Sequence, residues 1–265
     1  MITIKQLTNI VRDASNLMTV DEFEIMQKRG CENIVTTSDL AVQNFLCNKL
    51  SEIMPKSGFL CEEKDINDIK HEYTWIIDPI DGTANYSRGF NQCAICVGLK
   101  HHDEMEMGIV YIPRTNELFH AEKNKGAYLN GERIYVSDRT FNNAILCTAL
   151  PVYYKEHSEV CSKIILEAFN KCNDIRRFGA CAPELCYLAM GRCELYFEHK
   201  LGPWDYAAAS LIVTEAGGTI SSANGDPLSL TQATGVIAAN NISNYNQLLK
   251  IVTSNYKSNK SNSQN

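Results

Sequence analysis

Apolar residues recur every three or four positions at the start of the chain, at Ile4, Leu7, Val11, Ala14 and Met18. This spacing places the five side chains on one face of a helix. The pattern therefore predicts an amphipathic helix over residues 4–18.

A second helix is predicted to begin within Thr36-Thr37-Ser38-Asp39 and to end at Pro55. Asp39 is most simply interpreted as a residue that caps the first turn of this helix. The apolar positions expected to face inward are Leu40, Phe45, Leu46, Leu50 and Ile53.

Shorter apolar runs predict strands through the middle of the chain. Residues 58–61 and 75–77 form two such runs, and residues 93–137 have the pattern of an antiparallel meander. Asn130-Gly131 is a strong hairpin signal because both residues tolerate the positive φ of a tight turn. The meander strands are predicted at 93–99, 105–112, 117–121 and 127–136.

The C-terminal half alternates between strands and helices. Strands are predicted at 144–148, 174–178, 193–198 and 235–239, and helices at 157–170, from 179 to Gly191, at 206–216 and at 242–252. Residues 254–265 contain mainly Ser, Asn, Lys and Gln and are expected to form a frayed tail. The chain is therefore predicted to fold as one unit, residues 1–265, in two lobes at 1–142 and 143–253.

Composition and charge narrow the possible partners. The 265 residues carry a net charge of −6, which argues against nucleic acid or an anionic membrane as a partner. We expect neither a signal peptide nor a membrane span. The eleven cysteines are scattered and odd in number, which favours free thiols in a reducing cytoplasm.

Two motifs are interpreted as structural. Cys93 and Cys96 match C-x-x-C, but in a strand the two sulfurs would face opposite sides, so we do not expect a zinc or redox site. His101, His102 and His120 are expected to be surface residues rather than ligands, since no spacing groups them.

The strongest candidate for chemistry is the turn that follows the apolar run Trp75-Ile76-Ile77. Pro79 restricts its own φ, and Gly82 permits a positive φ, so a compact turn here can aim Asp78 and Asp81 at one point. Two carboxylates and the backbone carbonyl of Ile80 would form an oxygen site suited to Mg²⁺ or Mn²⁺. An ordinary loop is the alternative, because Asp-Pro and Asp-Gly are common in turns.

Further acidic residues fall at predicted ends of elements. If they converged, two or three divalent cations would neutralise them, an arrangement suited to hydrolysis of a phosphate ester. Convergence does not follow from the sequence alone, and capping or solvated loops are the alternatives. The acidic residues at element ends are Asp39, Glu62, Asp78, Asp81, Glu198 and Asp205, and Glu63 is adjacent to Glu62.

The motifs occur together in a recognisable order: Ile34-Val35-Thr36 with Asp39, Glu62-Glu63, Trp75 before Asp78-Pro79-Ile80-Asp81-Gly82-Thr83, Asn85-Tyr86, Gly89-Phe90, Trp204-Asp205-Tyr206-Ala207-Ala208 and Glu215-Ala216-Gly217-Gly218. In this order they resemble the inositol monophosphatase family, within the lithium-sensitive, magnesium-dependent phosphatases. The resemblance implies a layered α-β-α-β-α sandwich, a homodimer, and hydrolysis of inositol monophosphate to myo-inositol and phosphate. It also implies that residues 1–142 form a metal and phosphate lobe and residues 143–253 a substrate lobe.

The same resemblance assigns metal ligands. Glu62, Asp78 and the Ile80 carbonyl would hold one Mg²⁺ ion, with Mn²⁺ as a possible substitute. Asp78, Asp81 and Asp205 would hold a second ion, and Glu62 would contribute to a weaker third.

The resemblance further assigns catalytic and substrate contacts. Thr83 with Asp39 would polarise the attacking water, and Glu63 would orient metal-bound water. The amides of Gly82 and Thr83 would contact the phosphate. The full set of expected substrate contacts is Asp81, Gly82, Thr83, Gly179, Cys181, Glu198 and Asp205.

The chain departs from the family pattern at two motifs, of which the second concerns specificity for the alcohol. Cys61 stands where glycine is usual, with little effect expected, and Ala180-Cys181 stands where a small hydroxyl residue and alanine are favoured. The alternatives within the family are a 3′(2′),5′-bisphosphate nucleotidase, a histidinol-phosphatase and a fructose-1,6-bisphosphatase. A non-catalytic metal-binding subunit is the alternative of a different class.

Overall fold

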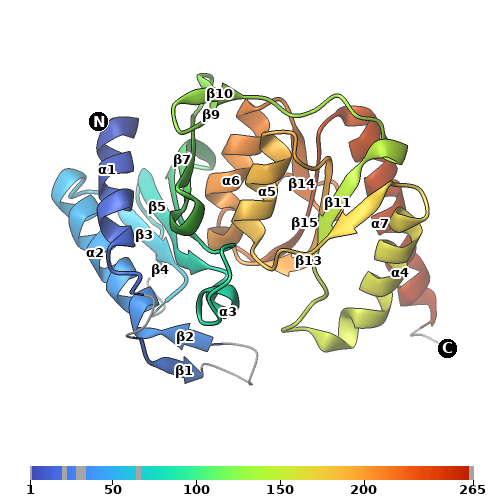
Figure 1. The fold of residues 1–265 in the computed structure, drawn as a ribbon, viewed down its shortest axis with the longest axis horizontal. Coiled ribbons are helices and arrows are strands. Elements are labelled where there is room, and N and C mark those ends of the chain that lie inside the picture. The colour runs from blue at the N-terminus through green and yellow to red at the C-terminus, as the bar shows by residue number, and fades with distance from the viewer. Residues whose placement is uncertain (1, 20–22, 28–33, 64–66, 263–265) are drawn as a thin grey trace.

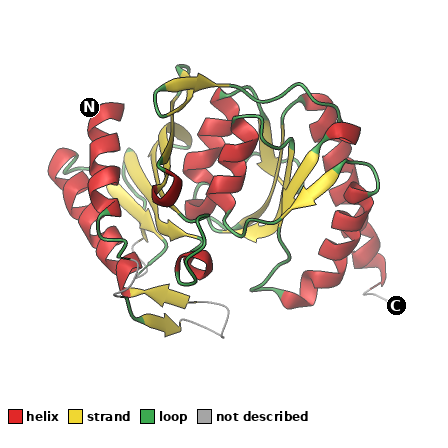
Figure 2. Cartoon of the chain, viewed as in Figure 1, coloured by secondary structure: helices red, strands yellow, loops and turns green. Residues whose placement is uncertain are grey.

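The computed structural model describes residues 2–19, 23–27, 34–63 and 67–262. Two sheets alternate with three layers of helices, so that the order of layers is helix, sheet, helix, sheet, helix (Figures 1 and 2). Three clusters of buried apolar residues fill the spaces between these layers. The predicted α-β-α-β-α sandwich is confirmed.

The first helical layer consists of α1 (Ile4–Ser15) and α2 (Thr37–Ile53). Each helix begins with a capping box in which a threonine, Thr3 or Thr36, accepts from the amide three residues later. The apolar side chains of both helices pack on the larger sheet. The buried residues that the two helices contribute to this packing include Leu7, Val11, Leu46 and Leu50.

The larger sheet has eight strands in the order β10-β9-β8-β7-β6-β5-β3-β4. Strands β6 to β10 form the predicted antiparallel meander. Strand β5 pairs with β6 in antiparallel and with β3 in parallel. Asn130 and Gly131 join β9 to β10 with φ values of 50° and 89°, as the hairpin signal predicts. The strands are β3 (Gly58–Cys61), β4 (Asn67–Asp68), β5 (Tyr73–Asp81), β6 (Ala94–His101), β7 (Glu104–Ile112), β8 (Glu117–Glu122), β9 (Gly126–Leu129) and β10 (Glu132–Ile134).

The middle layer consists of α5 (Cys181–Ala189) and α6 (Pro203–Glu215), which lie between the two sheets (Figure 1). Ala208 on α6 approaches the backbone of the larger sheet very closely. A Cβ added to Gly108 on β7 would lie 2.4 Å from the Ala208 carbonyl oxygen. The close approach holds α6 against the larger sheet, which includes β5, the strand that leads into the acidic turn.

The smaller sheet has the order β12-β11-β13-β15-β14, and α4 (Ser158–Phe169) and α7 (Ile242–Asn262) cover its outer face (Figure 1). Strands β12, β11 and β13 run parallel, and β13, β15 and β14 are antiparallel neighbours. These strands are β11 (Ile145–Thr148), β12 (Asp174–Arg176), β13 (Leu195–Leu201), β14 (Thr219–Ser222) and β15 (Thr234–Ala239).

Several short elements complete the fold. Strands β1 (Ile25–Gln27) and β2 (Ile34–Thr36) form a small antiparallel pair, and β2 leads directly into α2. Helix α3 (Thr83–Tyr86) follows the acidic turn. The 3-10 helices are η1 (Pro113–Thr115), η2 (Phe141–Asn143) and η3 (Lys155–His157). The described residues include no helix long and apolar enough to cross a membrane.

The prediction of a frayed tail over 254–265 is wrong for residues 254–262, because α7 continues to Asn262. Tyr256 packs against the apolar cluster beneath α4 and α7, and its hydroxyl lies 2.7 Å from His199 Nδ1. Asn255 donates to the carboxylate of Glu167 on α4 at 2.8 Å. These tertiary contacts stabilise a segment whose composition alone does not predict a helix.

The cysteines of the described segments are free thiols. Cys93 belongs to a small cluster with Ile80 and Tyr86, whereas Cys96 packs in the core between the two sheets. The two side chains of this C-x-x-C sequence therefore pack in different apolar clusters, and Cys93 lies just before β6 rather than within it.

Candidate metal centre

The acidic turn forms at the end of β5. The β5–β6 pairing shifts register between Asp78 and Asp81, and the Ile80 amide donates to Asp78 Oδ1 at 3.0 Å. Gly82 has φ +83°, and a Cβ there would lie 2.9 Å from both the Ala180 Cβ and the Gln92 carbonyl oxygen. The turn therefore requires glycine both for its backbone conformation and for space.

Three carboxylates from two distant parts of the chain meet at this turn. One oxygen from each of Asp78, Asp81 and Asp205 lies within 4.8 Å of the others. Asp205 is in the first turn of α6, where it accepts from the Gly202 amide at 2.7 Å. The packing of α6 against the larger sheet brings this third carboxylate to β5.

Burial strongly affects the titration of this cluster. Desolvation, followed by the charges of Glu62, Asp81 and Asp205, raises the pKa of Asp78 well above its ordinary value. Desolvation followed by the Glu62 charge has the same effect on the pKa of Asp205. Desolvation raises the pKa of Asp81 to about 7, although the hydrogen bond from the Ala182 amide lowers it.

The donor set fits a hard divalent cation. It consists of carboxylate oxygens and a nearby carbonyl, the ligands that Mg²⁺ prefers. Among the described residues, no lysine or arginine forms an ion pair with Asp78, Asp81 or Asp205. A bound divalent cation would supply the missing positive charge and lower the three pKa values.

Asp81, at the end of β5 in the larger sheet, also contacts the first residues of α5 in the middle layer. Its two carboxylate oxygens accept from the Cys181 amide at 3.3 Å and the Ala182 amide at 2.6 Å. Cys181 is among the expected substrate contacts, whereas here its amide donates to Asp81. The N-terminus of α5 thus stabilises a negative charge in the cluster itself.

Thr83 and Asp39 form the predicted pair. The Thr83 hydroxyl lies 3.2 Å from Asp39 Oδ1 and 3.0 Å from the Ile80 carbonyl oxygen. Asp39 also closes the capping box of α2, since its Oδ2 accepts from the Thr36 amide at 2.7 Å. Desolvation raises the pKa of Asp39 to about 6, despite the lowering effect of the Thr36 hydrogen bonds. Asp39 is therefore both a cap and a partner of Thr83.

Glu62 and Glu63 follow β3, beside β5. The Glu62 amide donates to the Ile77 carbonyl at 3.1 Å, and the side chain of Glu62 is partly exposed. Glu63 is buried, and its backbone makes reciprocal bonds of 2.7 and 2.9 Å with the Gln43 side chain. Gln43 lies one helical turn after Asp39, so one face of α2 positions both acidic segments.

The expected alcohol-side residues also lie near the cluster. Glu198 on β13 accepts from the Tyr196 hydroxyl at 2.7 Å, and desolvation raises the pKa of Glu198 to about 7. Its charge is among the causes that raise the pKa of Asp81. Gly179 has φ +82° and borders the Asn85 side chain.

Two further residues that the sequence did not assign fix the segment before α5. Asn85 Nδ2 donates to the carbonyls of Gln92 and Phe178, both at 2.7 Å. Glu184 Oε1 accepts from the amides of Phe178 and Gly179 at 2.6 and 2.9 Å. Desolvation raises the pKa of Glu184 to about 8. An acidic residue in the first turn of a predicted helix was the available signal for this role.

Comparisons with known proteins give a consistent result. A profile of the inositol monophosphatase family matches residues 2–257. "Nus factor SuhB" of Vibrio cholerae is 38% identical over 210 residues, which are 78% of each chain. The structure of Thermotoga maritima IMPase TM1415 superposes with a TM-score of 0.84 at 28% identity, covering 96% of this chain and 99% of that one. An IMPase/NADP phosphatase complexed with Mg²⁺ and phosphate shares the fold, with a TM-score of 0.82 at 23% identity and coverage of 93% and 92%.

The layered fold and the buried carboxylate cluster define an α/β protein with acidic groups able to bind a metal ion. The chain belongs to the inositol monophosphatase family.

Proposed function

We propose that the protein is a Mg²⁺-dependent phosphomonoesterase that hydrolyses inositol monophosphate to myo-inositol and phosphate. The observation that carries this proposal is the convergence of Asp78, Asp81 and Asp205 within 4.8 Å. Thr83, which directly follows the same turn, contacts Asp39 on α2. Metal ligands and a proton acceptor are thus held by one short segment and the two helix starts beside it.

Two or three Mg²⁺ ions are the proposed cofactor, and Mn²⁺ has the same ligand preference. Glu62, Asp78 and the Ile80 carbonyl would hold one ion, and Asp78, Asp81 and Asp205 another. When bound, the ions would neutralise the phosphate, lower the pKa of a water molecule and stabilise the leaving oxygen.

The chain's own residues handle the proton. The water oxygen forms the new bond to phosphorus while the bond to the alcohol oxygen breaks. The Thr83 hydroxyl accepts the water proton as its own proton passes to Asp39 Oδ1, and solvent supplies a proton to the alcohol oxygen. A pKa of about 6 suits Asp39 to this base role near neutral pH. Glu63 is proposed to orient the water.

Substrate contacts come from both lobes. The amides of Gly82 and Thr83 would bind the phosphate, with Asp81 and Asp205 acting through the metal ions. Gly179, Cys181 and Glu198 would meet the alcohol. The Cys181 amide already donates to Asp81, so a contact by this residue would involve its side chain or require Asp81 to turn toward the metal.

A non-catalytic role is the second candidate, because several curated relatives are named Nus factors. Such a role would use the protein as a binding subunit whether or not it turns over a phosphate ester. Hydrolysis and binding are separable by measuring turnover directly.

The test is phosphate release from inositol 1-phosphate, a 3′,5′-nucleotide bisphosphate, histidinol phosphate and fructose 1,6-bisphosphate. Each ester is assayed with Mg²⁺ and with EDTA. Asp81→Asn should abolish turnover, whereas Asp138→Asn, at an exposed site, should not change it. The best ester identifies the branch of the family. Failure to hydrolyse any of them, in folded protein that binds Mg²⁺, would favour the non-catalytic role.

We also propose a cytoplasmic homodimer. Apolar side chains of α4 and the segment before it are unusually exposed, including Leu150 at 44%, Leu166 at 59% and Phe169 at 43%. Burial of this surface in a two-fold contact with a second copy would remove it from water. Light scattering at several protein concentrations tests the assembly.

A further inference from the structure

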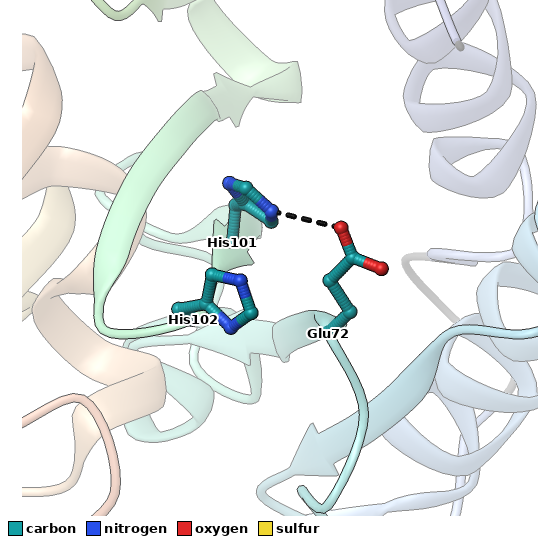
Figure 3. Close-up of side chains that lie close together, drawn as sticks. All are labelled: Glu72, His101 and His102. Atoms are coloured by element: carbon teal, nitrogen blue, oxygen red, sulfur yellow. Dashed lines mark hydrogen bonds and ion pairs between the residues drawn. The ribbon is translucent and has the colours of Figure 1, made fainter.

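Two histidines and a glutamate lie together at the opposite end of β5 from the acidic turn (Figure 3). Glu72 immediately precedes β5, His101 is the last residue of β6, and His102 begins the turn to β7. Strand pairing places Tyr73 opposite His101, which brings Glu72 beside the histidines. One ligand atom from each residue lies within 4.8 Å of the others.

Contacts within the cluster hold its members in place. His101 Nε2 lies 3.0 Å from Glu72 Oε1, and the His102 amide donates to the Glu72 carbonyl at 2.9 Å. The His101 ring stacks on Tyr73 with centroids 4.5 Å apart and planes at 17°. The centroid of the His102 ring lies 4.3 Å from that of the His101 ring, with the ring planes at 37°. The two imidazoles therefore need only small rotations to share a ligand.

The backbone of the turn contributes to this placement. His102 has φ +53°, a left-handed conformation that few residues adopt easily. The ammonium of Lys100 donates to the His102 carbonyl at 2.8 Å, which fixes the peptide that follows. The turn thus presents both rings on the side of Glu72.

We propose that Glu72, His101 and His102 form a binding site for a transition-metal cation of the Zn²⁺ class. Two imidazole nitrogens and one carboxylate are a common ligand set for such ions, and water completes the coordination. Mg²⁺ prefers oxygen ligands and does not compete well for imidazole. The site therefore differs in ligand chemistry from the carboxylate cluster.

The proposed site is also distant from that cluster. Asp78 in β5 lies six positions after Glu72, which corresponds to roughly 20 Å at about 3.3 Å per residue. A cation here would join the segment before β5 to the β6–β7 hairpin. Binding to the folded protein alone would stabilise it, by an amount that grows with the logarithm of the cation concentration above Kd.

The test is a Co²⁺ titration of untagged, metal-free protein, followed by visible absorption, because Co²⁺ in the tetrahedral geometry typical of a zinc site gives intense bands. Excess Mg²⁺ is present throughout to occupy the carboxylate cluster. Wild-type protein should bind one equivalent of Co²⁺ and show these bands. Added Zn²⁺ should displace the Co²⁺ and abolish the bands.

Variants locate the site. His101→Gln and His102→Asn should each abolish the bands, and asparagine is chosen because it tolerates the positive φ. Glu72→Gln should weaken binding about tenfold or more. His120→Gln on β8 and His157→Gln, whose ring lies 4.4 Å from His199, are matched controls that should keep the bands. Bands that persist in a His101→Gln/His102→Asn double variant, or that are missing from the wild type, would overturn the proposal.

Discussion

The Thr83 hydroxyl has one hydrogen and two acceptors, Asp39 Oδ1 at 3.2 Å and the Ile80 carbonyl oxygen at 3.0 Å. In the proposed mechanism, the first contact is the one that moves a proton. The second keeps the side chain in the rotamer that faces the acidic turn. The position therefore requires a hydroxyl rather than a side chain of a given size.

Thr83→Ala should lower kcat by about 10²- to 10⁴-fold, the usual contribution of a positioned acid–base group. Thr83→Ser keeps the hydroxyl and should retain most of the activity. Steady-state phosphate release with saturating Mg²⁺ measures both. Equal activity in the serine and alanine variants would show that the hydroxyl has no catalytic role.

Glu184 provides a pH-dependent contribution to stability. Its pKa in the folded protein is about 8, above the ordinary value of 4.5. Between pH 4.5 and 8, the Glu184 carboxyl is therefore protonated in the folded state but ionised in the unfolded state. The stability that its protonated form contributes is present below pH 4.5 and is lost as the pH rises to about 8.

Glu184→Gln keeps an oxygen acceptor for the Phe178 and Gly179 amides but does not titrate. Between pH 5 and 8, the unfolding free energy of this variant should fall less steeply with pH than that of the wild type. The two slopes should differ by up to about 1.4 kcal/mol per pH unit. Urea denaturation at a series of pH values measures it, with exposed Glu132→Gln as the control. Parallel pH profiles for wild type and Glu184→Gln would contradict the assignment.

At the scale of elements, the position of α6 decides whether Asp205 reaches β5. Ala208 packs directly on the backbone of β7 at Gly108, where no Cβ fits. Small residues on the helix and glycines in the sheet permit this separation. The proposed metal centre therefore depends on packing contacts that are remote from the carboxylates that would bind the cation.

Gly108→Ala should destabilise the protein by about 1–3 kcal/mol or more, because the new methyl group would lie 2.4 Å from a backbone carbonyl. Gly98→Ala on β6 is the matched control. Its new Cβ first meets the flexible end of Met105, at 2.6 Å, and the nearest Ala208 atom is 3.5 Å away. Chemical denaturation should show the smaller loss for Gly98→Ala, and a reversed order would be inconsistent with the packing argument.

At the scale of the whole molecule, the carboxylate cluster connects the larger sheet to the middle helices. Without a cation, buried carboxylates of like charge oppose this arrangement. With a bound cation, the same residues would hold β5 and α6 together. Cofactor binding and stability should therefore be linked.

Asp205→Asn tests this linkage, since the amide oxygen can still accept from Gly202. In EDTA, the variant should melt at or above the temperature of the wild type, because one buried charge is removed. Mg²⁺ should raise the melting temperature of the wild type but have little effect on the variant. Thermal denaturation followed by circular dichroism measures all four combinations. Equal Mg²⁺ responses would argue against Asp205 as a ligand.

The sequence by itself determined the local features of this protein. Periods of two and of three to four residues identified the meander and most helices, since these patterns depend only on which side chains share a face. The turn at 78–83 was recognisable because proline and glycine restrict the backbone within a few residues. Asp39 was correctly predicted as part of the helix cap, because the capping hydrogen bonds join residues only three positions apart.

Only the tertiary structure decided which distant residues meet. Asp205 reaches Asp78 through the packing of α6, and Tyr256 extends α7 beyond its predicted end by packing on the core. Glu72 joins His101 because of strand register, which no spacing along the chain reveals. Local patterns report a residue's own element, whereas a site depends on how several elements pack against one another.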